Sequence, residues 1–332
     1  MDRVSRIGTE QSAGVAGFVQ QTQLLVESEQ RQAPRMAVNR RSNSLSRPVL
    51  TLAVVAAMLA ACSPLRTFNA LVPKDSAARQ VARGVAYGDG PRRKLDVYAP
   101  ARPASGAMPT VVFFYGGSWN SGTRAGYAFA GRALSARGFV VIVPDYRLVP
   151  QVRYPAFIED GAAAVRWAER HAGEYGGDPR RIVLVGHSAG AYIAAMLAVD
   201  ERWLGADRAA VKGWAGLAGP YDFAPFTVPA AVAAFGAWPD PTDTQPITHA
   251  GPGDPPALLL TGAADDTVQP RNSDALGQKL RGAGVSAEVR RYPRLGHIGI
   301  LTALAQPFRG RAPVLDDIAA FIARVTARPA EQ

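Results

Sequence analysis

Residues 182–190 read IVLVGHSAG, an apolar run that passes directly into the pattern Gly-x-Ser-x-Gly. The apolar run predicts a buried strand, and the small residues of 189–198 predict a helix. A serine on a sharp turn between a strand and a helix is held exposed at the end of a sheet. Glycines flank it because a Cβ there would collide with the neighbouring strand or helix. Ser188 is therefore a candidate nucleophile, with an ordinary serine in a glycine-rich turn as the alternative.

From about residue 80, strand-like and helix-like segments alternate along the chain. Segments 81–87 and 94–98 flank the turn Gly88-Asp89-Gly90 and predict a β-hairpin. Further strands are predicted at 110–114, 139–143, 182–185, 211–217, 257–260 and 287–291, and helices at 125–137, 157–171, after residue 188 and at 314–325. Continuous apolar strands separated by helices predict an α/β fold whose mostly parallel central sheet is covered by helices on both faces.

The chain has four histidines, so the search for a general base is short. His171 ends a predicted helix, where a cation complements the helix dipole. His187 lies inside the turn and points away from the serine hydroxyl, and His249 falls in an irregular stretch. His297 lies on a predicted loop between the last predicted strand and the C-terminal helix, which is where the base of this architecture arrives. His297 is therefore the candidate base.

Two carboxylates follow the predicted strand 257–260. The stretch TGAADDTV (261–268) contains Asp265 and Asp266, either of which could be the acid of a triad. In such a triad the histidine takes the serine proton, and the carboxylate holds the imidazole in the right tautomer. The turn at residues 186–190 has the pattern of a nucleophile elbow, and we call it the elbow below. The chain order serine, aspartate, histidine is the one expected of a nucleophile elbow on an α/β sheet.

A glycine-containing loop, YGGSWNSG (115–122), follows the predicted strand 110–114. Its backbone N–H groups could stabilise a developing oxyanion. Gly117 and Ser118, together with Ala189 beside the nucleophile, are the candidate donors. A tight turn would explain a glycine pair equally well, but its place ahead of the elbow favours the functional interpretation.

The chain resembles the α/β-hydrolase superfamily over residues 93–325. Within the superfamily it resembles small carboxylesterases akin to the hormone-sensitive-lipase group and to the kynurenine formamidase and feruloyl-esterase-like group. The stretches that carry the resemblance are PDYRLVPQVRYPA (144–156), GGDPRRIVLVGHSAGA (176–191) and TGAADDTV (261–268). The resemblance implies the α/β-hydrolase fold and a serine carboxylesterase that acts on short-chain or aryl esters through an acyl-enzyme. It implies no metal and no organic cofactor.

The resemblance also bears on single positions. The spacing Gly262-x-x-Asp265-x-x-Val268 is that of related enzymes and implies Asp265, rather than Asp266, as the acid. Relatives begin the glycine loop with histidine, which shapes the loop, whereas this chain has Tyr115. Ser118 stands where the lipase-like group has a third glycine, and with the following tryptophan it favours the formamidase-like and feruloyl-esterase-like branch.

Two other functions remain open beside the esterase. The same triad chemistry serves an aryl-formamide hydrolase or a peptidase-like amide hydrolase. A non-catalytic surface lipoprotein that has kept the fold is the third possibility. The presence of Ser188, Asp265 and His297 together argues against it, because a lapsed enzyme would be free to lose any of them.

The only cysteine, Cys62, ends the sequence Leu-Ala-Ala-Cys. Arg40 and Arg41, an apolar run at 49–61 and small residues precede it, which is typical of an export signal and too short to span a bilayer comfortably. The ending resembles the lipobox of bacterial lipoproteins and implies a signal peptide at 36–61 and a lipid-bearing Cys62 bound to a membrane. The alternative is a buried structural cysteine behind an uncleaved anchor.

The resemblance to lipoproteins also implies a location. Ser63 stands where aspartate marks inner-membrane retention, so we expect the cell envelope of a bacterium, at the outer membrane and facing the periplasm. Residues 1–35 are polar and fit poorly ahead of such a signal. We expect them to be a disordered extension or a mis-called start, with Met36 as the biological start.

The remaining expectations concern organisation and partners. We expect a tether at 62–79 and a catalytic domain at 80–328, with 223–255 as a lid or a surface connection, because residues 221–255 carry seven prolines and no clear strand. The net charge of +10 comes from dispersed arginines, which disfavours nucleic acid as a partner. A small-molecule ester is the expected substrate, and the oligomeric state is left open.

Overall fold

The computed structural model describes residues 64–102 and 104–327. The predictions for residues 1–35, for the signal peptide 36–61 and for Cys62 therefore lie outside the described residues. Across the part of the chain that is described, we find no helix with the length and apolar character needed to cross a membrane.

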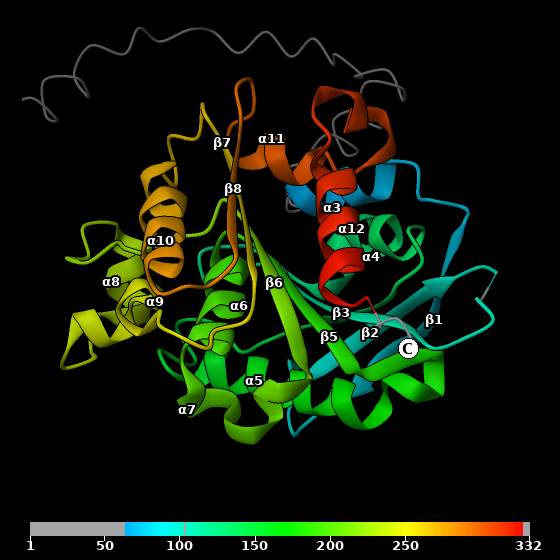
Figure 1. Ribbon diagram of the computed structural model, residues 1–332, viewed down its shortest axis with the longest axis horizontal. Coiled ribbons are helices and arrows are strands. Elements are labelled where there is room, and N and C mark those ends of the chain that lie inside the picture. Colours follow the sequence, from blue (N-terminus) through cyan, green and yellow to red (C-terminus); the bar gives the residue numbers. More distant parts are fainter. Residues whose placement is uncertain (1–63, 103, 328–332) are drawn as a thin grey trace, which may run out of the picture. The chain divides into compact units, whose positions relative to one another are not determined.

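Eight strands of the described chain form one sheet, in the order β1-β2-β4-β3-β5-β6-β7-β8 (Figure 1). All neighbours are parallel except β1 with β2 and β2 with β4. The strands are β1 (Ala78–Ala86), β2 (Lys94–Pro100), β3 (Met108–Phe114), β4 (Val140–Pro144), β5 (Gly177–His187), β6 (Val211–Leu217), β7 (Ala257–Gly262) and β8 (Ala287–Tyr292). The predicted mostly parallel α/β sheet, with its antiparallel hairpin at the start, is confirmed.

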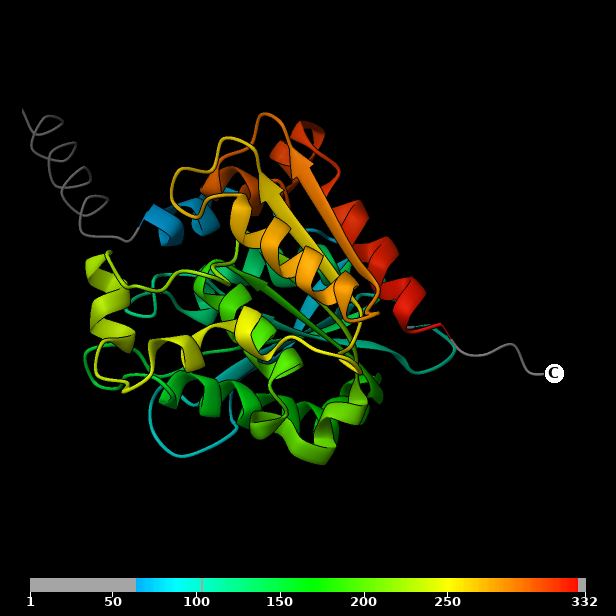
Figure 2. The same ribbon diagram turned by 60° about the vertical axis from the view of Figure 1, so that its left-hand side comes forward.

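Helices cover both faces of this sheet (Figures 1 and 2). Helices α4 and α12 contact each other on one face, and α5, α6 and α10 lie on the other. The α-helices are α3 (Pro64–Leu71), α4 (Ala128–Ser135), α5 (Ala156–His171), α6 (Ala189–Val199), α7 (Glu201–Leu204), α8 (Pro229–Phe235), α9 (Pro246–His249), α10 (Arg271–Gly282), α11 (His297–Thr302) and α12 (Val314–Val325). The shorter 3₁₀ helices are η1 (Arg124–Tyr127), η2 (Ala172–Tyr175), η3 (Gly205–Ala210), η4 (Pro241–Thr244) and η5 (Gln306–Arg311).

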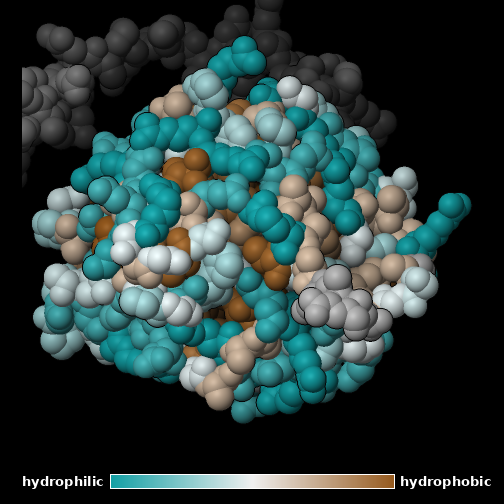
Figure 3. All heavy atoms as spheres, viewed as in Figure 1, coloured by the Kyte–Doolittle hydropathy of each residue, from teal (hydrophilic) through white to brown (hydrophobic). Residues whose placement is uncertain are grey.

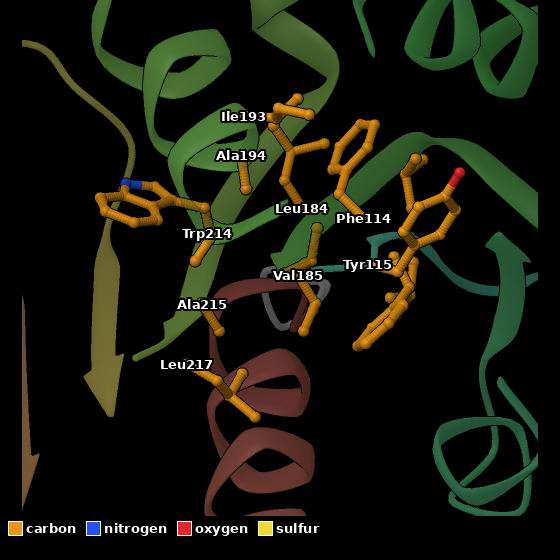
Figure 4. Packing of buried hydrophobic residues seen from close by; sticks show 14 of the residues in the cluster. Phe114, Tyr115, Leu184, Val185, Ile193, Ala194, Trp214, Ala215 and Leu217 are labelled. Carbon is orange, nitrogen blue, oxygen red and sulfur yellow. The ribbon is translucent and has the colours of Figure 1, made fainter. Parts of the chain in front are cut away.

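Helix α6 lies at the centre of the core. All of its residues are buried, as expected of a helix that is apolar on every side. Figure 4 shows Ile193 of α6 beside Leu184 of β5, with Trp214 of β6 nearby on the same face of the sheet. This packing fixes the start of α6, and with it Ser188, against the middle of the sheet.

The predicted tether at 62–79 needs correction. From residue 64 the chain forms α3 and then packs on the domain, because α3 is amphipathic and its apolar side is covered. Phe68 makes an edge contact with Phe129, with ring centroids 5.1 Å apart, and Asn69 accepts a hydrogen bond from the N–H of Phe129 at 3.1 Å. Asp75 is held by a bidentate ion pair with Arg309. The folded domain therefore includes residues 64–79.

The irregular stretch 221–255 contains α8, η4 and α9 but no strand within the described residues. Its rings pack on the core through an aromatic cluster that also includes residues outside the stretch. The aromatic cluster consists of Trp119, Tyr154, Phe157, Tyr192, Phe223, Phe226, Phe235 and Trp238. Main-chain contacts add to this packing, since the N–H of Tyr154 donates to the carbonyl of Ala234 at 2.9 Å.

Hydrophilic side chains cover most of the face shown in Figure 3, with hydrophobic residues scattered among them. The large hydrophobic residues that are exposed on the described chain are Leu71, Val228, Val232 and Ile298. Val228 precedes α8, Val232 lies within α8, and Ile298 follows His297. These three lie on segments that follow the carboxyl ends of parallel strands.

Candidate active site

Ser188 occupies a strained turn between β5 and α6. Its φ of 54° and ψ of −121° are unusual for a residue with a side chain. The turn is possible because its neighbours are glycines: a Cβ on Gly186 would lie 2.2 Å from the carbonyl oxygen of Gly190, and one on Gly190 would lie 2.1 Å from that of Phe114. The N–H of Ser188 donates to the carbonyl of Leu217 on β6 at 2.8 Å, which ties the turn to the sheet.

The structure brings Ser188, His297 and Asp265 together at the carboxyl edge of the sheet. Nε2 of His297 lies 2.9 Å from Oγ of Ser188, and its Nδ1 lies 2.9 Å from Oδ2 of Asp265. Ser188 and His297 are 109 positions apart in the chain, and Asp265 and His297 are 32 positions apart. The side chain of Asp265 is fully buried, and that of His297 is 11 % exposed. This geometry allows a proton to pass from Ser188 to His297 while a carboxylate fixes the imidazole tautomer.

Asp265 and Asp266 have different surroundings. Oδ1 of Asp265 accepts the N–H groups of Thr267 at 3.0 Å and Val268 at 2.8 Å, which leaves Oδ2 for His297. Asp266 is exposed and accepts only a long hydrogen bond from the hydroxyl of Thr267. The structure therefore places Asp265, and not Asp266, on the imidazole.

Two loops pack directly on each other: the acid loop (263–270), which carries Asp265, and the base loop (293–296), which leads to His297. The N–H of Ala264 donates to the carbonyl of Leu295 at 3.1 Å. A Cβ on Gly262 would lie 2.1 Å from that same carbonyl oxygen, so glycine is required there. His297 is the first residue of the short helix α11 rather than a loop residue as predicted, and the close contact of the loops sets where that helix begins.

His171 and His249 lie away from these three residues. His171 stacks on Trp167 and bonds to Glu174 at 2.7 Å on an exposed part of α5 and η2. His249 contacts the main-chain oxygen of Asp243 in the 221–255 stretch. Neither contacts the triad.

The glycine loop 115–122 lies against the elbow. A Cβ on Gly116 would lie 3.0 Å from Cβ of Ser188, so the backbones approach as closely as glycine permits. Gly117, Ser118 and Trp119 have φ values of 132°, 49° and 58°. The N–H groups of Gly117 and Ser118 make no hydrogen bond within the described residues. Ala189 is the first residue of α6, where a helical N–H has no internal partner. These three N–H groups are thus free to serve as donors.

Comparisons with known proteins show the family to which this chain belongs. The family model BD-FAE matches residues 95–226, which include the glycine loop and Ser188. Carboxylesterase NlhH of Mycobacterium tuberculosis is 32% identical over 231 residues, which cover 62% of this chain and 70% of NlhH. The chain belongs to the α/β-hydrolase carboxylesterases.

Two further similarities concern the sequence and the fold of this α/β-hydrolase. Isoprenylcysteine alpha-carbonyl methylesterase ICME of Arabidopsis thaliana is 28% identical over 273 residues, which cover 74% of this chain and 62% of ICME. The crystal structure of esterase B from Lactobacillus rhamnosis has a TM-score of 0.70 at 20% identity, covering 83% of this chain and 95% of that one. Against the rice and Arabidopsis methylesterases, the matches span only 25% to 62% of their length.

In this α/β-hydrolase, Tyr115 takes over the shaping of the glycine loop. Its buried ring stacks between those of Tyr127 and Tyr146, at centroid distances of 5.3 and 4.7 Å. Its hydroxyl donates to Oδ1 of Asp145 at 2.9 Å and accepts from Nη2 of Arg92 at 2.7 Å. Burial raises the pKa of Tyr115, so the phenol stays protonated. The departure from histidine therefore leaves the loop firmly held.

Arg92 and Asp145 support the loop, and sequence reasoning missed both. Nη2 of Arg92 also donates to the carbonyl of Gly122 at 2.9 Å, so one guanidinium holds both ends of the loop. Asp145 is 4 % exposed and accepts the N–H of Arg124 at 2.7 Å. The available signal was an acidic residue directly after the buried strand β4, because such a residue reaches the same edge of the sheet as Ser188.

Two hollows border segments of this carboxylesterase-family site. One of about 640 Å³ is lined by Asn120 of the glycine loop and by Arg92, among others. Another of about 410 Å³ lies between the acid loop, at Asp266 and Thr267, and Phe223 at the start of the 221–255 stretch. The 221–255 stretch thus forms part of the wall beside the acid loop.

Proposed function

We propose that this chain hydrolyses short-chain or aryl carboxylic esters through an acyl-enzyme on Ser188. The observation that carries the proposal is the hydrogen-bonded series from Oγ of Ser188 through His297 to Asp265, with 2.9 Å at each step. His297 takes the serine proton as Oγ attacks the ester carbonyl carbon, and the resulting imidazolium gives that proton to the leaving alcohol. Water then cleaves the acyl-enzyme, with His297 again as the base.

The oxyanion that forms at each addition step needs fixed donors. In our proposal the N–H groups of Gly117, Ser118 and Ala189 supply them, since these groups have no partner within the described residues. The strained loop holds the donors in place before substrate arrives, so little reorganisation is needed during the reaction. Loss of one such donor typically costs on the order of 100-fold in rate.

The preference for short or flat acyl groups is supported by the aromatic cluster. Trp119 directly follows the donor Ser118 and is 5 % exposed. Its ring lies 4.8 Å from that of Phe235 and 6.0 Å from that of Phe223, measured between centroids. These rings fill the space behind the loop, which leaves little room there for a long chain.

A panel of substrates tests the proposed function. We expect kcat/KM to be highest for p-nitrophenyl acetate or butyrate and to fall by at least tenfold for a long acyl ester, because the aromatic cluster restricts the acyl side. N-formylkynurenine would be the poorer substrate. A preference for N-formylkynurenine would instead support the aryl-formamide hydrolase, and failure to cleave any of these compounds would support the non-catalytic lipoprotein.

We also propose that acyl chains on Cys62 anchor the protein to the outer membrane of a bacterium, on the periplasmic side. The support is the Leu-Ala-Ala-Cys ending in the sequence. Since α3 begins at Pro64, the two residues after Cys62 span at most about 7 Å, and the folded domain would lie close to the bilayer. Several acyl chains at about 0.8 kcal/mol per buried methylene would hold it firmly.

The Cys62→Ser variant tests the anchor. In a Gram-negative host we expect wild-type protein in the membrane fraction and labelled by radioactive palmitate, whereas the variant should incorporate no label and any processed enzyme should be soluble. The esterase activity of the purified variant should stay within about twofold of wild type. Wild-type protein that stays cytosolic, unlabelled and uncleaved would show instead that Cys62 is an ordinary cysteine.

A further inference from the structure

His187, the residue between Gly186 and Ser188, makes a contact that the proposed chemistry does not use. Its side chain is buried, and Nε2 lies 3.0 Å from the main-chain oxygen of His297. A carbonyl oxygen only accepts, so Nε2 carries the proton and Nδ1 carries the lone pair. His187, which precedes Ser188 in the chain, therefore holds the backbone of His297, the residue that activates Ser188.

The other ring nitrogen of His187 faces the glycine loop. Nδ1 is buried and has no hydrogen-bond partner within the described residues. A Cβ built on Gly116 would lie 2.8 Å from it. His187 thus lies where the elbow, the base loop and the glycine loop meet: its ring packs closely against Gly116, and its single donor binds the main chain of His297.

Charge explains why a neutral ring is needed there. Burial, and next the charge of His297, lower the pKa of His187 from its ordinary 6.5 to about 3. The two imidazole centroids are 5.0 Å apart. When His297 takes the proton of Ser188, a second cation at this distance would oppose the imidazolium. The neutral ring of His187 holds His297 without that penalty.

We infer that His187 is a positioning residue, whose Nε2–H fixes the main chain of His297 so that its imidazole stays aimed at Oγ of Ser188. This inference rests on the proposed esterase function. A misplacement of about 1 Å between reacting groups can cost about 100-fold in rate. Loss of the donor should therefore lower kcat, while KM should change little, because acylation and deacylation both use His297 and should slow together.

Two amide variants isolate the donor. Glutamine places its amide nitrogen near the position of Nε2, whereas asparagine has the same chemistry but reaches only to the position of Nδ1. We expect His187→Gln to keep kcat within about threefold of wild type and His187→Asn to lose about 10- to 100-fold, with KM within about twofold in both. His171→Leu, far from the triad, is the control and should leave kcat unchanged.

The rate at which a fluorophosphonate labels Ser188 gives a second readout that needs no ester substrate. It should fall in His187→Asn and recover in His187→Gln, with full final labelling in both. Should wild type hydrolyse no ester yet label, the proposed function fails while the labelling rates still decide the role of His187. Equal rates in the two folded variants, or a wild type that does not label, would overturn the inference. Near-UV circular dichroism checks that each variant is folded.

The buried neutral ring also predicts an acid sensitivity. The titratable group that faces His187 is His297, which in turn contacts Asp265. Between pH 6.5 and about 3 the unfolded chain binds a proton at His187 that the folded chain does not, so stability falls as pH falls. For each unit by which the pH falls, the equilibrium constant for unfolding should rise up to tenfold more for wild type than for His187→Gln. Equal slopes in denaturant titrations would show that His187 is not held neutral.

Discussion

Replacing Ser188 by alanine abolishes ester hydrolysis, with an expected loss of kcat on the order of 10⁵- to 10⁶-fold. The change removes a single oxygen, the atom 2.9 Å from Nε2 of His297, and keeps the Cβ and the backbone of the turn. The N–H of residue 188 still donates to Leu217, so the free energy of unfolding should stay within about 1 kcal/mol of wild type. Steady-state assays and denaturant titration measure the two effects.

Labelling with a fluorophosphonate completes the Ser188 experiment. Wild type should be labelled once per chain, and Ser188→Ala should not be labelled. Ser135→Ala is a matched control, because Ser135 on α4 is also buried and its hydroxyl has no partner within the described residues. It should leave both activity and labelling intact. Full labelling of Ser188→Ala would mean that the nucleophile is another residue.

The second large effect concerns the two neighbouring aspartates. In Asp265→Asn the remaining oxygen would keep the N–H groups of Thr267 and Val268, so the new NH₂ group would face Nδ1 of His297. The imidazole would then carry its proton on Nε2 and could not accept one from Ser188. We expect kcat to fall about 10⁴-fold.

Asp266→Asn is the control for Asp265→Asn. Asp266 is exposed and does not contact His297, so we expect kcat within about twofold of wild type. Both variants alter the same loop and remove one negative charge, which separates the tautomer effect from a general electrostatic one. A larger loss in Asp266→Asn than in Asp265→Asn would transfer the role of the acid to Asp266.

The sequence predicted the sheet and the elbow well because both depend on local patterns. Buried parallel strands are continuous apolar runs, and the turn at Ser188 requires glycines at fixed offsets, so each leaves a signal in a short window. Asp265 was harder. Asp265 and Asp266 are identical and adjacent, and only the turn that buries Asp265 and exposes Asp266 distinguishes them as the acid. The choice of Asp265 from the sequence therefore depended on the spacing seen in related enzymes.

What the sequence did not predict depends on contacts between distant segments. Helix α3 follows directly on an apolar run and is short, so a tether was the natural interpretation of residues 62–79. Its place on the domain depends on Phe68 meeting Phe129 and Phe308, far along the chain. In the same way, Arg92 reaches Tyr115 and Gly122 across 23 and 30 positions. Such pairings have no local periodicity to reveal them.

The four non-glycine residues with positive φ on the described chain, Ser118, Trp119, Ser188 and Ala218, all follow strands at the carboxyl edge of the sheet. Each costs about 1–3 kcal/mol of backbone energy, and the surrounding fold must supply it. This backbone strain lowers the thermal stability of the protein at Ser188 itself, in the glycine loop that packs against it and directly after β6. Selection for thermostability alone would relax these four positions towards glycine, whereas selection for turnover would keep them strained.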